Sequence, residues 1–316
     1  MKILVTGAAG FIGSHLCEAL VKEHEVIGLD NFCDYYDIKI KRNNLLELAK
    51  FDNFQIIKAD IRSKSELEDI FSHHKFDLII HLAAMAGVRP SIADPVLYTE
   101  VNINGTVNLL EQCKKHSIRK FIFASSSSVY GNNKKVPFAE VDPVDLPISP
   151  YAATKKAGEL ICHTYHHLEK ISMVCLRFFT VYGPRQRPDL AIHKFARKIL
   201  DDEMISLFGD GSTKRDYTYI DDIVDGILKS INFVNDGYHY EIFNLGESQT
   251  ISLSKMIETI EKAIEKTAQK ETLPLQPGDV DQTFADISKA KKLLGYNPKT
   301  NFIDGIEKFM QWLKDN

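Results

Sequence analysis

The glycine-rich stretch within residues 1–30 constrains the fold of this chain more than any other feature. An apolar run at 3–5, typical of a buried parallel strand, breaks at Gly7, and Gly10 and Gly13 follow before an amphipathic helix. Glycines at this spacing allow a tight turn, close approach of the backbone to a pyrophosphate, and close packing of the helix on the strand. The helix N-terminus adds free N–H groups for phosphate oxygens. The stretch therefore predicts a dinucleotide-binding loop, with a purely structural turn as the alternative.

A carboxylate at the end of the next strand favours the dinucleotide interpretation. The apolar run 26–29 ends at Asp30, at about the twenty-residue distance at which an acid binds the ribose hydroxyls of the adenosine half. This acid would repel the additional phosphate of NADP, so we expect NAD. The residues expected to contact the cofactor here are Gly7, Gly10, Phe11, Ile12, Gly13, Asp30 and Asn31.

Composition excludes several other classes of protein. The chain has 316 residues, 44% of them hydrophobic, and a net charge of −4, which argues against nucleic acid or an anionic membrane as the main partner. No signal peptide precedes the first strand and no apolar run is long enough to span a membrane. The 5 cysteines are scattered and never form a CxxC pair. We therefore expect reduced thiols, a cytoplasmic protein and no metal site.

The rest of the first half alternates between strands and helices. Strands are predicted at 54–58, 77–80, 120–124 and 172–178, and helices at 95–116 and after Pro150. This alternation predicts right-handed βαβ units and an α/β fold with a doubly wound, Rossmann-type parallel sheet. We expect residues 1–181 to form the NAD-binding domain and 182–316 a smaller, mixed α/β lobe that predominantly binds substrate.

Ligands of such sheets bind at the carboxyl ends of the strands, where further candidate residues lie. Asp60 and Ile61 could flank the adenine ring, although Asp60 could equally cap a helix. His81 has the pattern of a core histidine rather than a ligand, and the small-residue loop after it would let backbone lie close to a cofactor. These positions add Asp60, Ile61, Leu82, Ala83 and Ala84 to the expected cofactor contacts.

Tyr151 and Lys155 are the candidates for proton transfer. They lie four residues apart on one predicted helix and therefore share a face. A free tyrosine has a pKa near ~10, and a neighbouring ammonium together with a positive nicotinamide ring would lower it towards neutrality. A bare YxxxK pattern is common on helix surfaces, so the dinucleotide loop supplies the context that favours function. Strand alternation puts Ser126 and Ser128 on one face, but it does not decide which serine of 125–128 assists Tyr151.

Four motifs together resemble the extended short-chain dehydrogenase/reductase family of nucleotide-sugar enzymes over essentially the whole chain: TGAAGFIG, the serine-rich strand end followed by VYG, YAATK, and RDYTYIDD. Within it, DNFCDYYD, MAGVRPS, FFTVYGPRQRPD and QPGDVDQTFAD are most similar to the UDP-glucuronate 4-epimerases. The resemblance implies that Tyr151 is the base, that Lys155 binds the nicotinamide ribose, and that Ser126 is the catalytic hydroxyl. The residues expected to contact the UDP-sugar are Arg89, Ser126, Ser127, Ser128, Thr180, Arg185, Phe208, Arg215 and Asp279.

Differences from related nucleotide-sugar enzymes narrow the choice of reaction. Ser127 and Ser128 stand where sugar-nucleotide dehydratases carry an Asp-Glu pair, and the Glu typical of the decarboxylases in this segment is also missing. Gln276 replaces an arginine of UDP-galactose 4-epimerases, which places more of the phosphate binding on Arg215. Pro90 stands where the glucuronate epimerases usually have tyrosine, so the loop that carries Arg89 could differ in shape.

The predicted reaction is the reversible 4-epimerisation of UDP-glucuronate to UDP-galacturonate through a 4-keto intermediate and enzyme-bound NADH. Arginine can hold the sugar carboxylate bidentately, and Arg185 is the first candidate, ahead of Arg89 and Arg187. The alternatives are a UDP-glucuronate decarboxylase, a neutral UDP-sugar 4-epimerase, or a non-catalytic NAD-dependent regulatory module. We also expect a homodimer, formed through the helices at 95–116 and 151–168 as is common in the family.

Overall fold

A seven-stranded sheet forms the centre of the computed structural model, which describes residues 1–274 and 280–316. All neighbouring strands of this sheet run parallel, in the order β11-β6-β5-β4-β1-β2-β3. The strands are β1 (Lys2–Thr6), β2 (Glu25–Asp30), β3 (Phe54–Lys58), β4 (Leu78–His81), β5 (Lys120–Ser126), β6 (Ser172–Phe178) and β11 (Tyr240–Leu245). The predicted doubly wound parallel sheet is confirmed, and β3 and β6 have the predicted bounds.

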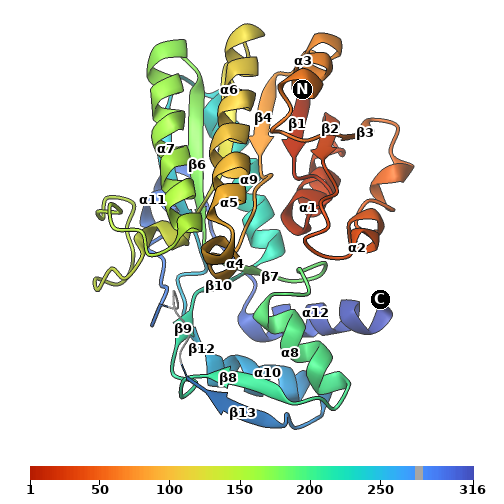
Figure 1. Ribbon diagram of the computed structural model, residues 1–316, viewed down its shortest axis with the longest axis vertical. Helices are drawn as coiled ribbons and strands as arrows, with labels where there is room; N and C mark the ends of the chain where they lie inside the picture. Colours follow the sequence, from red (N-terminus) through yellow and green to blue (C-terminus); the bar gives the residue numbers. More distant parts are fainter. Residues whose placement is uncertain (275–279) are drawn as a thin grey trace.

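Helices cover both faces of the sheet, and alternation along β1 shows the division. Ile3 and Val5 belong to the core on the side of α1 and α9, whereas Leu4 between them belongs to the core on the side of α3, α6 and α7 (Figure 1). The helices of these two layers are α1 (Phe11–Leu20), α3 (Lys64–His73), α6 (Gly105–Lys115), α7 (Pro150–Glu169) and α9 (Ile220–Asn235).

The helix predicted over 95–116 is interrupted. It consists of α5 (Pro95–Thr99), a π-helical turn (Glu100–Asn104) and α6. Within that turn the Asn102 amide accepts a bond from Met85 N at 2.8 Å and donates to Thr154 Oγ1 at 3.0 Å. The π turn therefore joins the loop after β4 to α7, at the kind of position where such turns often serve a function. The connection after β2 contains α2 (Ile38–Asn43) and a 3-10 turn (Leu48–Lys50).

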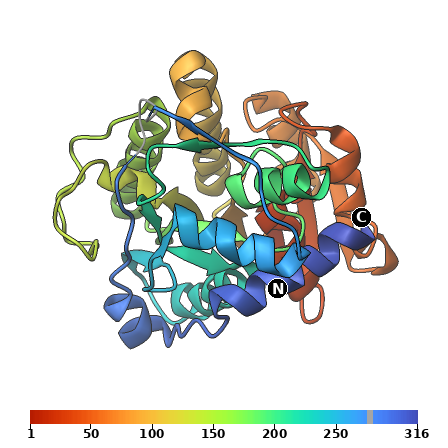
Figure 2. The same cartoon turned by 90° about the horizontal axis from the view of Figure 1, so that it is seen from below.

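A smaller lobe lies beneath the carboxyl ends of the strands (Figures 1 and 2). It contains three two-stranded sheets, β10-β7, β12-β9 and β13-β8, with α10 packed between α8 and α12. Its elements are β7 (Thr180–Tyr182), α8 (Ala191–Leu200), β8 (Ile205–Phe208), β9 (Lys214–Arg215), β10 (Tyr217–Tyr219), β12 (Ile251–Ser252), α10 (Leu253–Ile264), β13 (Lys270–Leu273) and α12 (Phe302–Asp315). Both α9 and β11 return to the large sheet, so the residues after 182 contribute to both parts of the molecule.

Three further observations concern the chemistry expected from the sequence. In the described part of the chain, no helix combines the length and hydrophobicity needed to cross a bilayer. The described residues also contain no group of three or more His, Cys, Asp or Glu side chains arranged to hold a metal ion. All five cysteines are free thiols, and only Cys33 among them is not buried.

Candidate active site

A cavity of about 390 Å³ lies at the carboxyl ends of the strands and is closed on one side by the segment that follows β6. Most of the site residues predicted from the sequence line this cavity. The expected cofactor-binding and substrate-binding sites therefore share one space. The predicted residues in its wall are Gly7, Gly10, Phe11, Ile12, Gly13, Asp30, Asn31, Asp60, Ile61, Leu82, Ala83, Ala84, Ser126, Ser127, Ser128, Tyr151, Lys155 and Thr180.

The glycine loop has the close backbone approaches that a phosphate-binding loop requires. Gly7 has φ +73°, and a Cβ there would lie 2.9 Å from the backbone nitrogen of Ala83 in the loop after β4. A Cβ on Gly13 would lie 2.1 Å from the carbonyl oxygen of Gly7, so no side chain fits between helix and loop. Helix α1 begins at Phe11 directly behind this loop, so its N-terminal N–H groups lie next to the cavity.

The two carboxylates at the ends of β2 and β3 are fixed by local hydrogen bonds. Asp30 accepts from Phe32 N at 2.8 Å and from Ala9 N at 3.2 Å, and it is only 6% exposed. A buried ammonium that the sequence analysis did not identify, that of Lys41 on α2, lies 3.6 Å from Asp30 Oδ1. No local sequence pattern predicts that Lys41 is buried beside Asp30, because its side chain is turned inward only by the fold of the connection after β2.

Asp60 does not cap a helix, which was one of the two roles that the sequence allowed for it. Ser63 caps α3 by accepting a bond from Glu66 N, whereas Asp60 binds the Asn31 amide at 3.0 Å and the Arg62 guanidinium through both of its oxygens. The bonds from Arg62 lower the pKa of Asp60 to about 2, against the effect of burial. Asp60 is therefore an ionised wall residue beside Ile61 in the cavity.

His81 is the core histidine that its pattern indicated. One ring nitrogen, Nδ1, lies 2.7 Å from Thr6 Oγ1, and the other, Nε2, lies 3.0 Å from Thr106 Oγ1. Burial lowers the pKa of His81 to about 3, so the ring is neutral at physiological pH. Both nitrogens are thus used to hold β1, β4 and α6 together behind the cavity.

The serines at the end of β5 separate into two roles. The Ser125 hydroxyl donates to Glu159 Oε1 at 2.7 Å, whereas the Ser126 hydroxyl donates to Ser128 Oγ at 3.0 Å and accepts from Ser128 N. The strand ends at Ser126 and a 3-10 turn (Ser127–Tyr130) follows, so the alternation predicted for Ser127 and Ser128 is wrong. The hydroxyl groups of Ser126 and Ser128 are still hydrogen-bonded, because the 3-10 turn brings Ser128 back towards Ser126.

Helix α7 presents Tyr151 and Lys155 to the cavity. Ser149 caps the helix through Ala152 N at 3.2 Å, and Lys155 Nζ donates to the carbonyl oxygen of Ala124 at 2.7 Å. The Lys155 ammonium lies 5.9 Å from the centre of the Tyr151 ring. Burial lowers the pKa of Lys155 to about 8, which still leaves it mainly protonated at neutral pH.

The electrostatics of Tyr151 differ from the sequence-based expectation. Burial raises the pKa of the phenol above its ordinary value, and a bond from the Ser126 side chain and the charge of Arg187 oppose this rise. The protein alone therefore does not lower the pKa of Tyr151, and the opposing cation is Arg187 rather than Lys155. The spacing on the helix could not indicate this, because Arg187 comes from a loop after β7.

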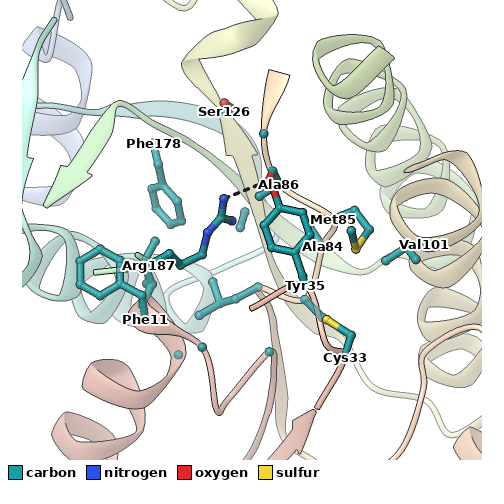
Figure 3. A pocket seen from close by; sticks show the side chains of 18 of the residues that line it. Phe11, Cys33, Tyr35, Ala84, Met85, Ala86, Val101, Ser126, Phe178 and Arg187 are labelled. Atoms are coloured by element: carbon teal, nitrogen blue, oxygen red, sulfur yellow. Dashed lines mark hydrogen bonds between the residues drawn. The ribbon is translucent and has the colours of Figure 1, made fainter. Parts of the chain in front are cut away.

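The arginines take places different from those predicted. Arg187 enters the cavity, where Nη2 donates to the carbonyl oxygen of Ala86 at 3.1 Å (Figure 3). Arg185, the first candidate for the sugar carboxylate, is absent from the cavity wall and pairs with Glu18 of α1 at 2.6 Å. Of the two arginines in this turn, Arg187 is therefore the one that lines the cavity.

Three other predicted substrate residues, Arg89, Phe208 and Arg215, do not line the cavity. The Arg89 guanidinium lies 4.9 Å from the centre of the Phe208 ring, where α4 (Val88–Ala93) approaches β8. Arg215 is on β9 and donates to the carbonyl oxygen of Lys214 at 2.8 Å. Asp279 and Gln276 lie outside the described residues.

Comparison with known proteins assigns the chain to a family. The family model described as GDP-mannose 4,6 dehydratase matches residues 4–309. The chain belongs to this family. This membership confirms the predicted likeness to the extended dehydrogenase/reductase enzymes that act on nucleotide sugars.

Individual relatives are similar over their full length. A UDP-glucuronate 4-epimerase of Thermodesulfobacterium geofontis is 45% identical over 99% of this chain and 96% of its own. A crystal structure of the UDP-glucuronic acid 4-epimerase from Bacillus cereus with UDP-glucuronic acid and NAD is 42% identical, covers 100% of this chain and 99% of its own, and has a TM-score of 0.92. A UDP-glucose 4-epimerase from Thermotoga maritima with UDP-glucose is 32% identical over 100% and 99% of the two chains, with a TM-score of 0.90.

Proposed function

We propose that this protein is an NAD-dependent epimerase that interconverts UDP-glucuronate and UDP-galacturonate. The observation that carries the proposal is the presence of the Arg187 guanidinium in the same cavity as Ser126, Tyr151 and Lys155. The only acids among the described residues of the cavity wall are Asp30 and Asp60, at the ends of β2 and β3. A dehydratase needs an acid beside its catalytic hydroxyl, so the positions of these two acids favour epimerisation over dehydration. The guanidinium of Arg187 favours an acidic sugar as the substrate. The relatives named UDP-glucuronate 4-epimerase support the same reaction.

The described residues fit NAD at the glycine loop. The close approaches of Gly7 and Gly13 leave room for a pyrophosphate but not for a side chain, and Asp30 is placed for the adenosine ribose. Bound NAD would supply the hydride acceptor and donor for C4 of the sugar. Lys155, beside the carbonyl of Ala124, would bind the nicotinamide ribose.

Tyr151 would carry the proton of the reaction. In the proposed role it removes the proton of the 4-hydroxyl group and gives it back after the 4-keto sugar has turned over. Ser126, which interacts with the Tyr151 phenol, would hydrogen-bond the same sugar oxygen. Because burial raises the pKa of Tyr151, the positive nicotinamide ring and Arg187 must both act to lower it.

The substrate would lie between Arg187 and the smaller lobe. Arg187 replaces Arg185 as our candidate for the sugar carboxylate, since its guanidinium lines the cavity and its bonds to Asp189 and Ala86 use Nε and Nη2, which leaves Nη1 for the sugar. Thr180, at the start of β7 in the cavity wall, would bind the turning sugar. Arg89, Phe208, Arg215 and Asp279 remain our candidates for the uridine diphosphate.

We further propose a cytoplasmic homodimer. Helices α5 and α6 pack beside α7, and large apolar side chains remain exposed on these helices: Val96 is 66% exposed, Leu160 58% and Leu168 66%. A second copy would bury these side chains in a four-helix contact. A reducing compartment agrees with four buried free thiols, and sedimentation of the purified protein tests the dimer.

The proposed reaction is tested by incubating the protein with UDP-glucuronate and NAD and following the sugar by NMR. UDP-galacturonate should accumulate until both epimers are present. The variant Tyr151→Phe should lose about 10² to 10⁴ in rate and still bind NAD, as expected for removal of one acid/base group. A UDP-pentose as the main product would identify a decarboxylase, and NAD binding without turnover of any UDP-sugar would identify a regulatory module.

A further inference from the structure

The Arg187 guanidinium is held by groups from three separate segments of the chain. Asp189 binds it through both oxygens, with Nε at 2.9 Å and Nη2 at 2.7 Å, and the carbonyl oxygen of Ala86 accepts from Nη2 at 3.1 Å. The third group is the ring of Tyr35, whose centre lies 5.1 Å from Arg187 Cζ. Figure 3 shows this ring beside the arginine in the cavity, with the bond to Ala86 behind it.

These contacts restrain different motions of the guanidinium. Hydrogen bonds from Nε and Nη2 lie close to the guanidinium plane, so they oppose displacement within that plane. They oppose tilting about the shared edge with Asp189 only weakly, and the Asp189 side chain is itself 39% exposed. The Tyr35 ring, which has Arg187 Cζ over it, opposes that tilt, because moving Cζ off the ring weakens the cation–π contact. Tyr35 is therefore the contact that fixes the orientation of the plane.

Tyr35 is itself held in place. It comes from the connection between β2 and α2 and lies in the cavity wall. A Cβ on Gly87 would lie 3.5 Å from the Tyr35 hydroxyl oxygen, so the loop after β4 passes directly beside the ring. Tyr151 lies in the same cavity wall. The motif DNFCDYYD, which carries Tyr35, thus reaches the catalytic end of the cavity.

We propose that Tyr35 is a positioning residue that orients Arg187 and thereby limits decarboxylation of the 4-keto intermediate. This inference rests on the proposed function. Oxidation at C4 makes a β-keto acid, in which the C5–C6 bond can break, releasing carbon dioxide while its electron pair forms an enolate with the C4 carbonyl. The enolate then takes a proton from water at C5, which leaves a UDP-4-keto-pentose and requires no further oxidant.

The orientation of the carboxylate decides whether the 4-keto intermediate is decarboxylated or epimerised. Carbon–carbon cleavage needs the C5–C6 bond perpendicular to the plane of the ketone, where its electrons overlap the carbonyl π-system. Asp189 and Ala86 engage Nε and Nη2, so the carboxylate would be bound from Nη1. A guanidinium of fixed orientation directs this donor to one place, whereas a tilting one lets the C5–C6 bond sample the reactive geometry. Loss of the Tyr35 ring should therefore change which product forms, and not only how fast.

The test measures, by mass spectrometry, the ratio of decarboxylated product to UDP-galacturonate for wild type, Tyr35→Leu, Tyr35→Phe, Arg187→Ala and Tyr35→Leu/Arg187→Ala. The decarboxylated product is the UDP-4-keto-pentose together with the UDP-pentose that forms where NADH returns its hydride to C4. We expect Tyr35→Leu to raise the ratio by roughly 3- to 30-fold, the range for one cation–π contact. Tyr35→Phe keeps the ring and should keep the wild-type ratio. In the Arg187→Ala background, Tyr35→Leu should change nothing further, because its effect passes through the guanidinium.

Each other outcome overturns the inference in an identifiable way. An unchanged ratio in Tyr35→Leu, with wild type forming UDP-galacturonate, overturns the role of Tyr35 and leaves the proposed function intact. A Tyr35→Leu effect that adds to that of Arg187→Ala excludes a route through the arginine. A wild-type protein that binds NAD but forms no UDP-galacturonate overturns the proposed function and this inference with it.

Discussion

At the scale of single residues, the two arginines of the loop after β7 take opposite roles. Arg185 has φ +63°, a left-handed conformation that is uncommon for a residue other than glycine, and it turns towards Glu18 on α1. Two residues later, Arg187 points into the cavity. The loop is thus anchored to α1 by one arginine while the other lines the cavity.

This difference predicts distinct effects of two matched substitutions. Arg187→Ala should lower epimerase turnover by about 10- to 100-fold, the loss expected for one charged hydrogen-bonded contact, and raise the share of UDP-pentose. Arg185→Ala should leave the product ratio unchanged, since its guanidinium pairs with Glu18 outside the cavity. Product analysis by mass spectrometry decides, and a pentose product from Arg185→Ala alone would contradict the assignment.

The sequence could place both arginines in one proline-bracketed turn but could not choose between them. That choice depends on the backbone conformation of Arg185, and no hydrophobic period or cap encodes it. Tyr151, Lys155 and Asp30 could be predicted, because helix spacing and strand ends fix their places. The inward turn of Lys41 and the cation–π contact of Tyr35 with Arg187 could not be predicted, because both depend on how the connection after β2 folds.

At the scale of elements, a buried ion pair connects α7 to the sheet. Arg177 of β6 binds Glu159 of α7 through Nε at 2.8 Å and Nη2 at 2.9 Å, and both side chains are 1% exposed. Glu159 also accepts the bond from Ser125 at the end of β5. The pair therefore ties the helix that carries Tyr151 to the strand end that carries Ser126.

Breaking this pair should be costly for stability. Arg177→Met leaves Glu159 buried without its main partner, and we expect a loss of about 3–5 kcal/mol in the free energy of unfolding. The control Lys156→Met removes a partly exposed partner of Glu159, at 3.5 Å, and should cost less than about 1 kcal/mol. Denaturant unfolding measures both, and equal losses would show that burial of the pair is not what matters.

The elements themselves were largely predictable, because apolar runs mark the buried strands and a period near 3.6 marks the helices. The π turn at Glu100–Asn104 was not, since apolar residues continue on both sides of it and only the contacts of Asn102 show why the helix deviates. The strand alternation expected for 125–128 failed for a related reason, as Ser127 begins a 3-10 turn without any change in composition.

At the scale of the whole molecule, the smaller lobe is joined to the sheet through buried acids. The Asp216 carboxylate, between β9 and β10, accepts bonds from Glu247 N at 2.8 Å, Ser248 N at 3.0 Å and Ala285 N at 3.1 Å. Burial and the neighbouring charges of Asp222 and Asp216 raise the pKa of Glu247 to about 8. The junction therefore contains a carboxyl group that is protonated at neutral pH.

The raised pKa predicts a specific pH dependence of stability. The folded state binds the Glu247 proton more tightly than the unfolded chain, in which the pKa is 4.5, so its contribution is full below that pH. The contribution is then lost as the pH rises to about 8. Glu247→Gln should flatten the fall in melting temperature over this interval, whereas Glu258→Gln, on the exposed side of α10, should not. Parallel curves for wild type and Glu247→Gln would contradict the account.

The central claim is that C4 of the sugar is oxidised and reduced again within this one cavity. It is tested most directly with UDP-glucuronate that carries deuterium at C4, by locating the label in the product by NMR. We predict UDP-galacturonate with the deuterium retained at C4, because the label leaves and returns in the same enclosed site. Loss of the label to water, or its retention in UDP-glucuronate with no epimer formed, would contradict the account.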